Sequence, residues 1–159
     1  MKVRGLALGC CLLLGAPALP AAAAAPVQRF LLVIGANAGS SDRPRLQYAL
    51  SDAERFARVM VDLGGVPVGN EVILRQPRLK DLIDAFETLS GRVAAARRTA
   101  GAGRIEIIIY YSGHADEQGL LLGGDRYSYR TLRDRLDEIA ADVRIAVLDA
   151  CASGAFTRL

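Results

Sequence analysis

The strongest constraint on the fold is a nearly continuous apolar run from Ile105 to Tyr111. Side chains alternate between the two faces of a strand, so apolar residues at almost every position require burial on both faces. A parallel sheet covered by helices on both faces meets that requirement. The run breaks off into Ser112, Gly113 and His114, and this histidine is the only one in the chain.

Shorter apolar runs alternate with helical periodicity along the rest of the sequence. We expect strands at 30–34, 72–74, 105–111 and 143–148, a small hairpin at 119–125, helices at 51–63, 77–93 and 129–139, and a solvated linker within 94–103. With 159 residues, 52% of them hydrophobic, the chain can build one core but hardly two domains. The order predicts an α/β fold, a three-layer α/β/α sandwich with a mostly parallel sheet.

The start and the end of the first helix carry explicit signals. Ser51 and Glu54 have the spacing of a capping box, in which a hydroxyl and a carboxylate bind free amides at a helix start. Gly64 and Gly65 follow the last periodic residue and are typical of a helix end. The sequence therefore predicts a helix that begins at Ser51.

Residues 1–23 have the order of a secretory signal peptide: basic residues, an apolar run from Leu6 to Leu14, and then small residues. The apolar run is too short to span a bilayer as a stable helix. We expect an exported protein, periplasmic or extracellular, with a mature chain that begins near Ala24 and one domain at 28–159.

An alternative to export as a free protein is attachment of a lipid at Cys10, because the residues before this cysteine loosely resemble a lipoprotein attachment site. It lies in the middle of the apolar run with little of that run upstream, which favours export without lipid.

Removal of the signal peptide changes the charge and the cysteine count. The formal charge falls from +3 to about +1, since 18 of the 20 basic residues remain against 17 acidic ones. This balance does not indicate a nucleic-acid partner. Cys151 becomes the only thiol, so no internal disulfide is possible, and it is either a small buried hydrophobe or a reactive group.

His114 and Cys151 each follow a predicted strand. If these strands are neighbours in a parallel sheet, their carboxyl ends lie about 5 Å apart. A thiol near pH 7 is mostly protonated, and a nearby imidazole can take its proton and later deliver it to a leaving amine. The amides of Gly113 and Cys151 are candidates to hold the oxyanion of a tetrahedral intermediate. The pair therefore predicts an acyl-transfer dyad.

Two motifs carry a family resemblance: YYSGHAD at 110–116 resembles the histidine motif of the caspase-like cysteine peptidases, and DACASG at 149–154 resembles their nucleophile motif. In detail they are more similar to the bacterial caspase-like and metacaspase branch than to animal caspases. The resemblance runs from about Phe30 to the last residue.

The resemblance implies a three-layer α/β sandwich and a cysteine endopeptidase acting on protein or peptide substrates. It implies that His114 is the general base, Cys151 the nucleophile and Gly113 an oxyanion contributor. Asp149 holds the position of a metacaspase aspartate that lines a pocket for Arg or Lys. Asp-Ala-Cys-Ala-Ser-Gly replaces the Gln-Ala-Cys motif of animal caspases, and the gap from His114 to Cys151 is 37 residues rather than about 50. These departures count against cleavage after aspartate and favour cleavage after a basic residue or another specificity.

The sequence stops at Leu159, eight residues past the nucleophile. The family continues with strands that complete the sheet and the other wall of the substrate groove. We therefore expect a domain truncated after its fourth core strand, with little or no activity unless a second chain or subunit supplies the rest.

Other functions remain open. A non-catalytic caspase-like module that binds or regulates another protein would also fit a short domain. Gly35–Gly39 after the first strand suggests nucleotide binding, but it lacks the spacing of the dinucleotide and phosphate-loop motifs. One histidine and one cysteine are too few for a zinc cage, so we expect no metal or other cofactor. Calcium dependence cannot be read from scattered aspartates such as Asp116 and Asp125.

Overall fold

A computed structural model of the protein describes residues 26–40, 43–99 and 103–158. The predicted signal peptide, its cleavage point near Ala24 and the alternative lipid site at Cys10 all lie outside the described residues. Within those ranges, no helix is long and apolar enough to cross a membrane.

The elements alternate between strand and helix as the sequence predicts. In order they are β1 (Val27–Gly35), α1 (Ala49–Asp62), β2 (Glu71–Arg75), α2 (Leu79–Thr99), β3 (Arg104–Ser112), β4 (His114–Ala115), β5 (Gly119–Leu122), β6 (Asp125–Ser128), α3 (Tyr129–Glu138), β7 (Val143–Asp149) and the 3-10 helix η1 (Ser153–Arg158). The short strand β4, which carries His114, was not predicted.

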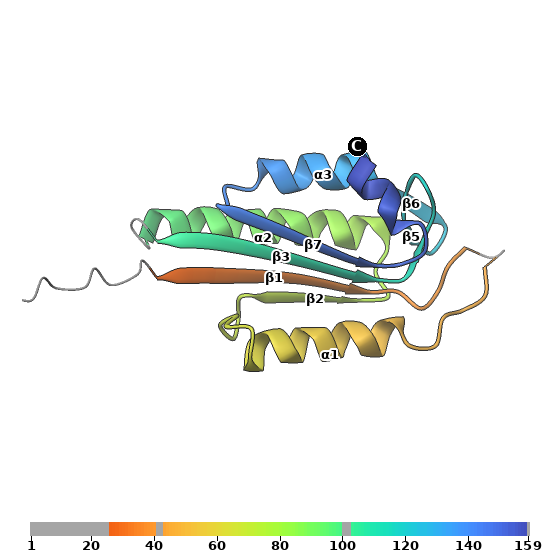
Figure 1. Cartoon of the computed structure of the whole chain (residues 1–159), viewed down its shortest axis with the longest axis horizontal. Coiled ribbons are helices and arrows are strands. Elements are labelled where there is room, and N and C mark those ends of the chain that lie inside the picture. The colour runs from red at the N-terminus through yellow and green to blue at the C-terminus, as the bar shows by residue number, and fades with distance from the viewer. Residues whose placement is uncertain (1–25, 41–42, 100–102, 159) are drawn as a thin grey trace, which may run out of the picture.

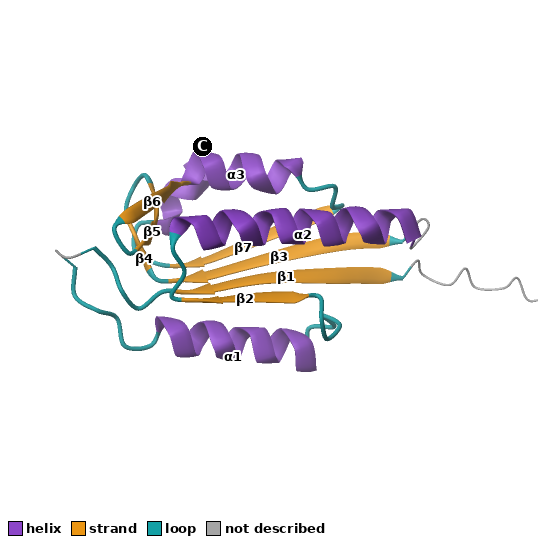
Figure 2. Cartoon of the chain, turned by 180° about the vertical axis from the view of Figure 1, so that it is seen from behind, coloured by secondary structure: helices purple, strands orange, loops and turns teal. Residues whose placement is uncertain are grey.

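The main sheet is parallel and has the strand order β2-β1-β3-β7. Helix α1 covers one of its faces, and α2 and α3 cover the other (Figure 1, Figure 2). The hairpin of β5 and β6, extended by β4, forms a separate antiparallel sheet beyond the carboxyl ends of the main strands. This confirms the α/β class and the three-layer arrangement.

Strand β3 lies between β1 and β7 and is buried on both faces, as its apolar run requires. Ile107, Ile109 and Tyr111 belong to the larger core beneath α2 and α3. Ile108 and Tyr110 belong to the smaller core beneath α1. The residues that follow β3 are therefore attached to an inner strand that is buried on both faces.

The predicted start of α1 is wrong. The helix begins at Ala49, and Ser51 donates its hydroxyl hydrogen to the Tyr48 carbonyl oxygen instead of capping an amide. The Leu50 amide donates to Asn37 Oδ1 at 2.9 Å, so the loop after β1 provides the cap. Such a cap depends on tertiary structure and has no local spacing signal.

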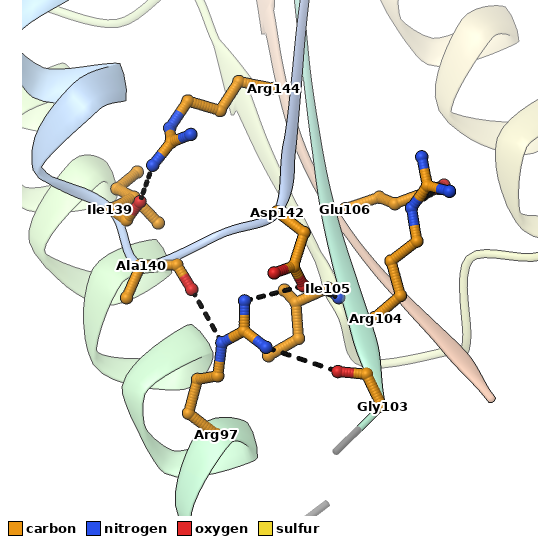
Figure 3. A network of polar contacts seen from close by, with 9 residues as sticks. All are labelled: Arg97, Gly103, Arg104, Ile105, Glu106, Ile139, Ala140, Asp142 and Arg144. Atoms are coloured by element: carbon orange, nitrogen blue, oxygen red, sulfur yellow. Dashed lines mark hydrogen bonds and ion pairs between the residues drawn. The ribbon is translucent and has the colours of Figure 1, made fainter. Parts of the chain in front are cut away.

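Helix α2 extends to Thr99, within the segment 94–103 that the sequence predicted as a helix end running into a linker. A polar network at the amino-terminal edge of the sheet holds its end (Figure 3). The Arg97 guanidinium donates to the Ala140 carbonyl at 3.0 Å and pairs with Asp142 Oδ2 at 2.6 Å. Asp142 also accepts the Ile105 amide at 2.7 Å. The network ties α2 to β3 and to the segment leading into β7.

Strand β7 is an edge of the main sheet. Ala146 and Leu148 pack on the core beneath α2 and α3. Ile145 and Val147 point to the other face, where they are 42% and 37% exposed. These two large apolar side chains therefore form an exposed apolar surface on an edge strand.

Candidate active site

Strand pairing brings the two predicted catalytic residues to one edge of the sheet. Strands β3 and β7 are parallel neighbours, with Ser112 in register with Asp149. His114 and Cys151 each lie two residues beyond that matched pair. The condition on which the predicted dyad depended, adjacency of the two strands, is therefore met.

The His114 imidazole is held by the loop that follows β1. Its Nε2 lies 2.8 Å from the Pro44 carbonyl oxygen. A carbonyl oxygen only accepts hydrogen bonds, so Nε2 is the protonated nitrogen of the neutral ring and Nδ1 keeps the lone pair. No hydrogen bond joins His114 to Cys151, both of which belong to the described residues. The imidazole is therefore oriented by a main-chain carbonyl rather than by the thiol.

Close packing explains the residue types around His114. Tyr111, fully buried, places its hydroxyl oxygen 2.6 Å from the His114 carbonyl oxygen and 2.9 Å from that of Leu121. Burial raises the pKa of Tyr111 well above its ordinary value, so the hydroxyl remains a donor. A Cβ at Gly113 would lie 2.5 Å from this hydroxyl, and a Cβ at Gly39 would lie 2.7 Å from the imidazole. A Cβ at either position would therefore force its neighbour to move.

The Gly113 amide, the predicted oxyanion donor, points at the Asp149 carbonyl oxygen at 3.4 Å. This is a long and weak hydrogen bond. Recruitment of the amide to an oxyanion would exchange this bond for a stronger, charge-assisted one.

The Cys151 thiol is exposed, which excludes the interpretation of this residue as a small buried hydrophobe. The next residue, Ala152, has a φ of 57°, a left-handed conformation that is unfavourable for a residue with a Cβ. Beyond it, η1 is anchored by Phe156, whose carbonyl accepts a hydrogen bond from Arg133 at 2.7 Å. The Arg133 guanidinium also lies over the Phe156 ring, 5.0 Å from its centre. Cys151 thus sits on a strained turn between β7 and the anchored 3-10 helix η1.

A cavity of about 440 Å³ opens beside Cys151, between the start of α1 and the ends of β3 and β7. Ser112, Asp149 and Asp52 are among the residues that line it. Asp149 thus lines a cavity beside Cys151. No sequence signal pointed to Asp52 as a lining residue, because α1 approaches the sheet through tertiary packing.

The loop after His114 is fixed by Asp116. Its carboxylate accepts the amides of Gln118 and Gly119 and pairs with Arg126, whose Nε lies 3.1 Å away. The Arg126 hydrogen bond lowers the pKa of Asp116. In the part of the chain that the structure describes, no group of three or more His, Cys, Asp or Glu side chains is placed to hold a metal ion.

A comparison with protein families gives a match between residues 28–158 and the family model described as "Caspase domain". The match spans the main sheet, its helices and both motifs around His114 and Cys151. A search of curated proteins finds no match.

Proposed function

The chain belongs to the caspase-domain family, and we propose that it is a cysteine endopeptidase with Cys151 as nucleophile and His114 as general base. The family match supports peptidase activity in general. The observation that carries the assignment of residues is the common edge of β3 and β7, where an exposed thiol and an oriented imidazole follow neighbouring strands.

In the proposed reaction, His114 Nδ1 takes the proton from the Cys151 thiol, and the thiolate attacks the carbonyl carbon of the scissile peptide bond. The amides of Gly113 and Cys151 stabilise the oxyanion. The C–N bond then breaks as the imidazolium gives its proton to the leaving amine, which leaves an acyl-thioester on Cys151. Water, deprotonated by His114, hydrolyses the thioester and releases the carboxylic acid and the free thiol.

Cleavage after a basic residue is supported by the charge of the cavity beside Cys151. Asp149 and Asp52 both line it, and carboxylates are the natural partners of a guanidinium or an ammonium group. Peptides that differ only in Arg or Gln before the scissile bond test this preference. The Asp149→Asn variant is expected to lose the preference for Arg while it keeps the turnover of the Gln peptide.

Labelling of Cys151 by an electrophilic peptide tests the dyad. We expect the full chain to be labelled, Cys151→Ser to be unreactive, and His114→Ala to be labelled at least 100 times more slowly, a rough loss typical of a removed general base. Retained labelling in a folded His114→Ala variant would remove His114 from the role of base.

We further propose that β7 pairs with a strand from a second chain or subunit. Two features of β7 support this pairing: it is an edge strand, and its side chains Ile145 and Val147 are exposed. Proteins normally cover unpaired strand edges and exposed apolar side chains. The rate of peptide hydrolysis should then rise more than linearly with protein concentration. A folded chain with reactive Cys151 that hydrolyses no peptide at any concentration would favour the second candidate, a non-catalytic binding module.

We also propose that the protein is exported, on the basis of the charged, apolar and small-residue order of residues 1–23. Amino-terminal sequencing of the mature protein is expected to give a start near Ala24. A start at Cys10 with an attached lipid would support the lipoprotein alternative.

A further inference from the structure

One buried polar group at the cavity beside Cys151 has no part in the reaction described above. Tyr110 lies on β3, two residues before Ser112 and on the same face of the sheet. It is 7% exposed and belongs to the core beneath α1, yet its hydroxyl donates to Asp149 Oδ2 at 3.1 Å. The hydroxyl is therefore the polar end of a core side chain that reaches the lining of the cavity.

The Tyr110 ring is held rigidly. It stacks on Phe56 of α1, with ring centres 4.1 Å apart and planes inclined by 12°. Burial, followed by the hydrogen bond to Asp149, raises the pKa of Tyr110 to about 12, and the charge of Asp52 acts in the same direction. At neutral pH the hydroxyl is therefore a protonated donor in a fixed position.

Asp149, in contrast, has little other support. It is the last residue of the edge strand β7 and its side chain is exposed. Among the described residues, Tyr110 is the only hydrogen-bond donor to its carboxylate. Without that donor the carboxylate could rotate freely about its side-chain torsions and would lose entropy when a ligand ordered it.

We propose that Tyr110 is a positioning residue for substrate specificity: its hydroxyl orients the Asp149 carboxylate toward the cavity for a cationic side chain. This inference rests on the proposed function, because it assigns Asp149 to the recognition of a basic residue. It adds that the specificity of the site depends on a hydrogen bond between two strands. Phe56 of α1, which stacks on the Tyr110 ring, then fixes the position of the donating hydroxyl.

The Tyr110→Phe variant tests the proposal, because Phe keeps the ring that stacks on Phe56 and removes only the hydroxyl. We expect the KM for a peptide with Arg before the scissile bond to rise about tenfold, the size of one hydrogen bond to a charged group. The kcat should be unchanged, since the interaction binds ground state and transition state alike. The Gln peptide should show no change in either constant.

Binding of benzamidine, an amidinium probe, gives a readout that does not need turnover. We expect its Kd to rise about tenfold in Tyr110→Phe. Tyr129→Phe is the matched control, because the buried Tyr129 hydroxyl has no hydrogen-bond partner within the described residues. In an Asp149→Asn background, Tyr110→Phe should have no further effect, since the hydroxyl acts through that carboxylate.

Three results would overturn the inference: a wild-type chain that does not bind benzamidine, a Tyr110→Phe variant with wild-type Kd, or the same loss in the Asp149→Asn background. A different result would refute the proposed endopeptidase function alone. If the chain binds benzamidine in a Tyr110-dependent manner but hydrolyses no peptide, the cation site stands and the endopeptidase assignment falls.

Discussion

Replacement of Gly39 by alanine should displace the His114 imidazole without disturbing the sheet. Gly39 has no positive φ, so its backbone conformation is open to alanine. The new Cβ, however, would lie 2.7 Å from His114 Cδ2 and 3.1 Å from Nε2. Ordinary contact begins at 3.4 Å, so the ring must move by about 0.7 Å. The neighbouring Arg43 Cβ, 3.0 Å away, hinders escape of the new methyl group on its other side.

This movement has a calculable cost. The displacement would lengthen or bend the hydrogen bond from Nε2 to the Pro44 carbonyl, which is 2.8 Å long, and would weaken it. A catalytic group misplaced by about 1 Å typically loses on the order of 100-fold in rate, or about 2.7 kcal/mol of transition-state stabilisation. We therefore expect kcat to fall about 100-fold in Gly39→Ala, with KM little changed.

The imidazole itself reports the change, because His114 is the only histidine in the chain. Nitrogen NMR of the wild type should show a single tautomer with the proton on Nε2, and Gly39→Ala should show a mixture. Gly91→Ala is the matched control, since its Cβ would meet nothing within 4 Å. A folded Gly39→Ala variant with the wild-type tautomer and wild-type kcat would refute the assignment of Gly39 and Pro44 as the supports of the base.

Three further changes should affect stability. Tyr111→Phe removes the hydroxyl that bonds the His114 carbonyl and should lower the free energy of unfolding in urea by about 1–3 kcal/mol, the usual loss for a buried hydrogen bond. Ala152→Gly relieves a left-handed residue and should raise that free energy by about 0.5–1 kcal/mol, so a loss would contradict the strained turn. The hydrogen bond from Arg97 lowers the pKa of Asp142, so its stabilisation is present above the unfolded-state pKa and is lost as pH falls through the lower folded-state value. Between pH 5 and about pH 2, the urea midpoint of the wild type should therefore fall more than that of Asp142→Asn.

The elements that the sequence predicts well are those whose signal is local. The continuous run Ile105–Tyr111 requires burial on both faces wherever it lies, and it became the central strand β3. The helix at 129–139 begins as expected, with Ser128 accepting the Thr131 amide as its cap. The positions of His114 and Cys151 followed from strand adjacency, a general property of consecutive strands in parallel sheets.

The features that the sequence did not reveal depend on residues far apart in the chain. The orienting group of His114 is the carbonyl of Pro44, 70 residues earlier, and a main-chain carbonyl has no side-chain signature. The cap on Leu50 comes from Asn37. Asp52 lines the cavity because α1 packs against β3, and its spacing indicates only a helix start. All three residues, Pro44, Asn37 and Asp52, lie in the loop between β1 and α1 or in the helix that follows it.

The two residues of the proposed dyad are held to different degrees, and this difference connects the unpaired edge of β7 to the proposed activity. His114 follows the central strand β3, is tied to Pro44, and belongs to the small sheet of β4, β5 and β6. Cys151 follows the edge strand β7 and precedes the left-handed residue Ala152. A strand that paired with β7 would order the nucleophile and Asp149 together, because both lie at its carboxyl end. Completion of the sheet is therefore expected to raise kcat through Cys151 and to lower KM through Asp149, while the tautomer of His114 stays unchanged.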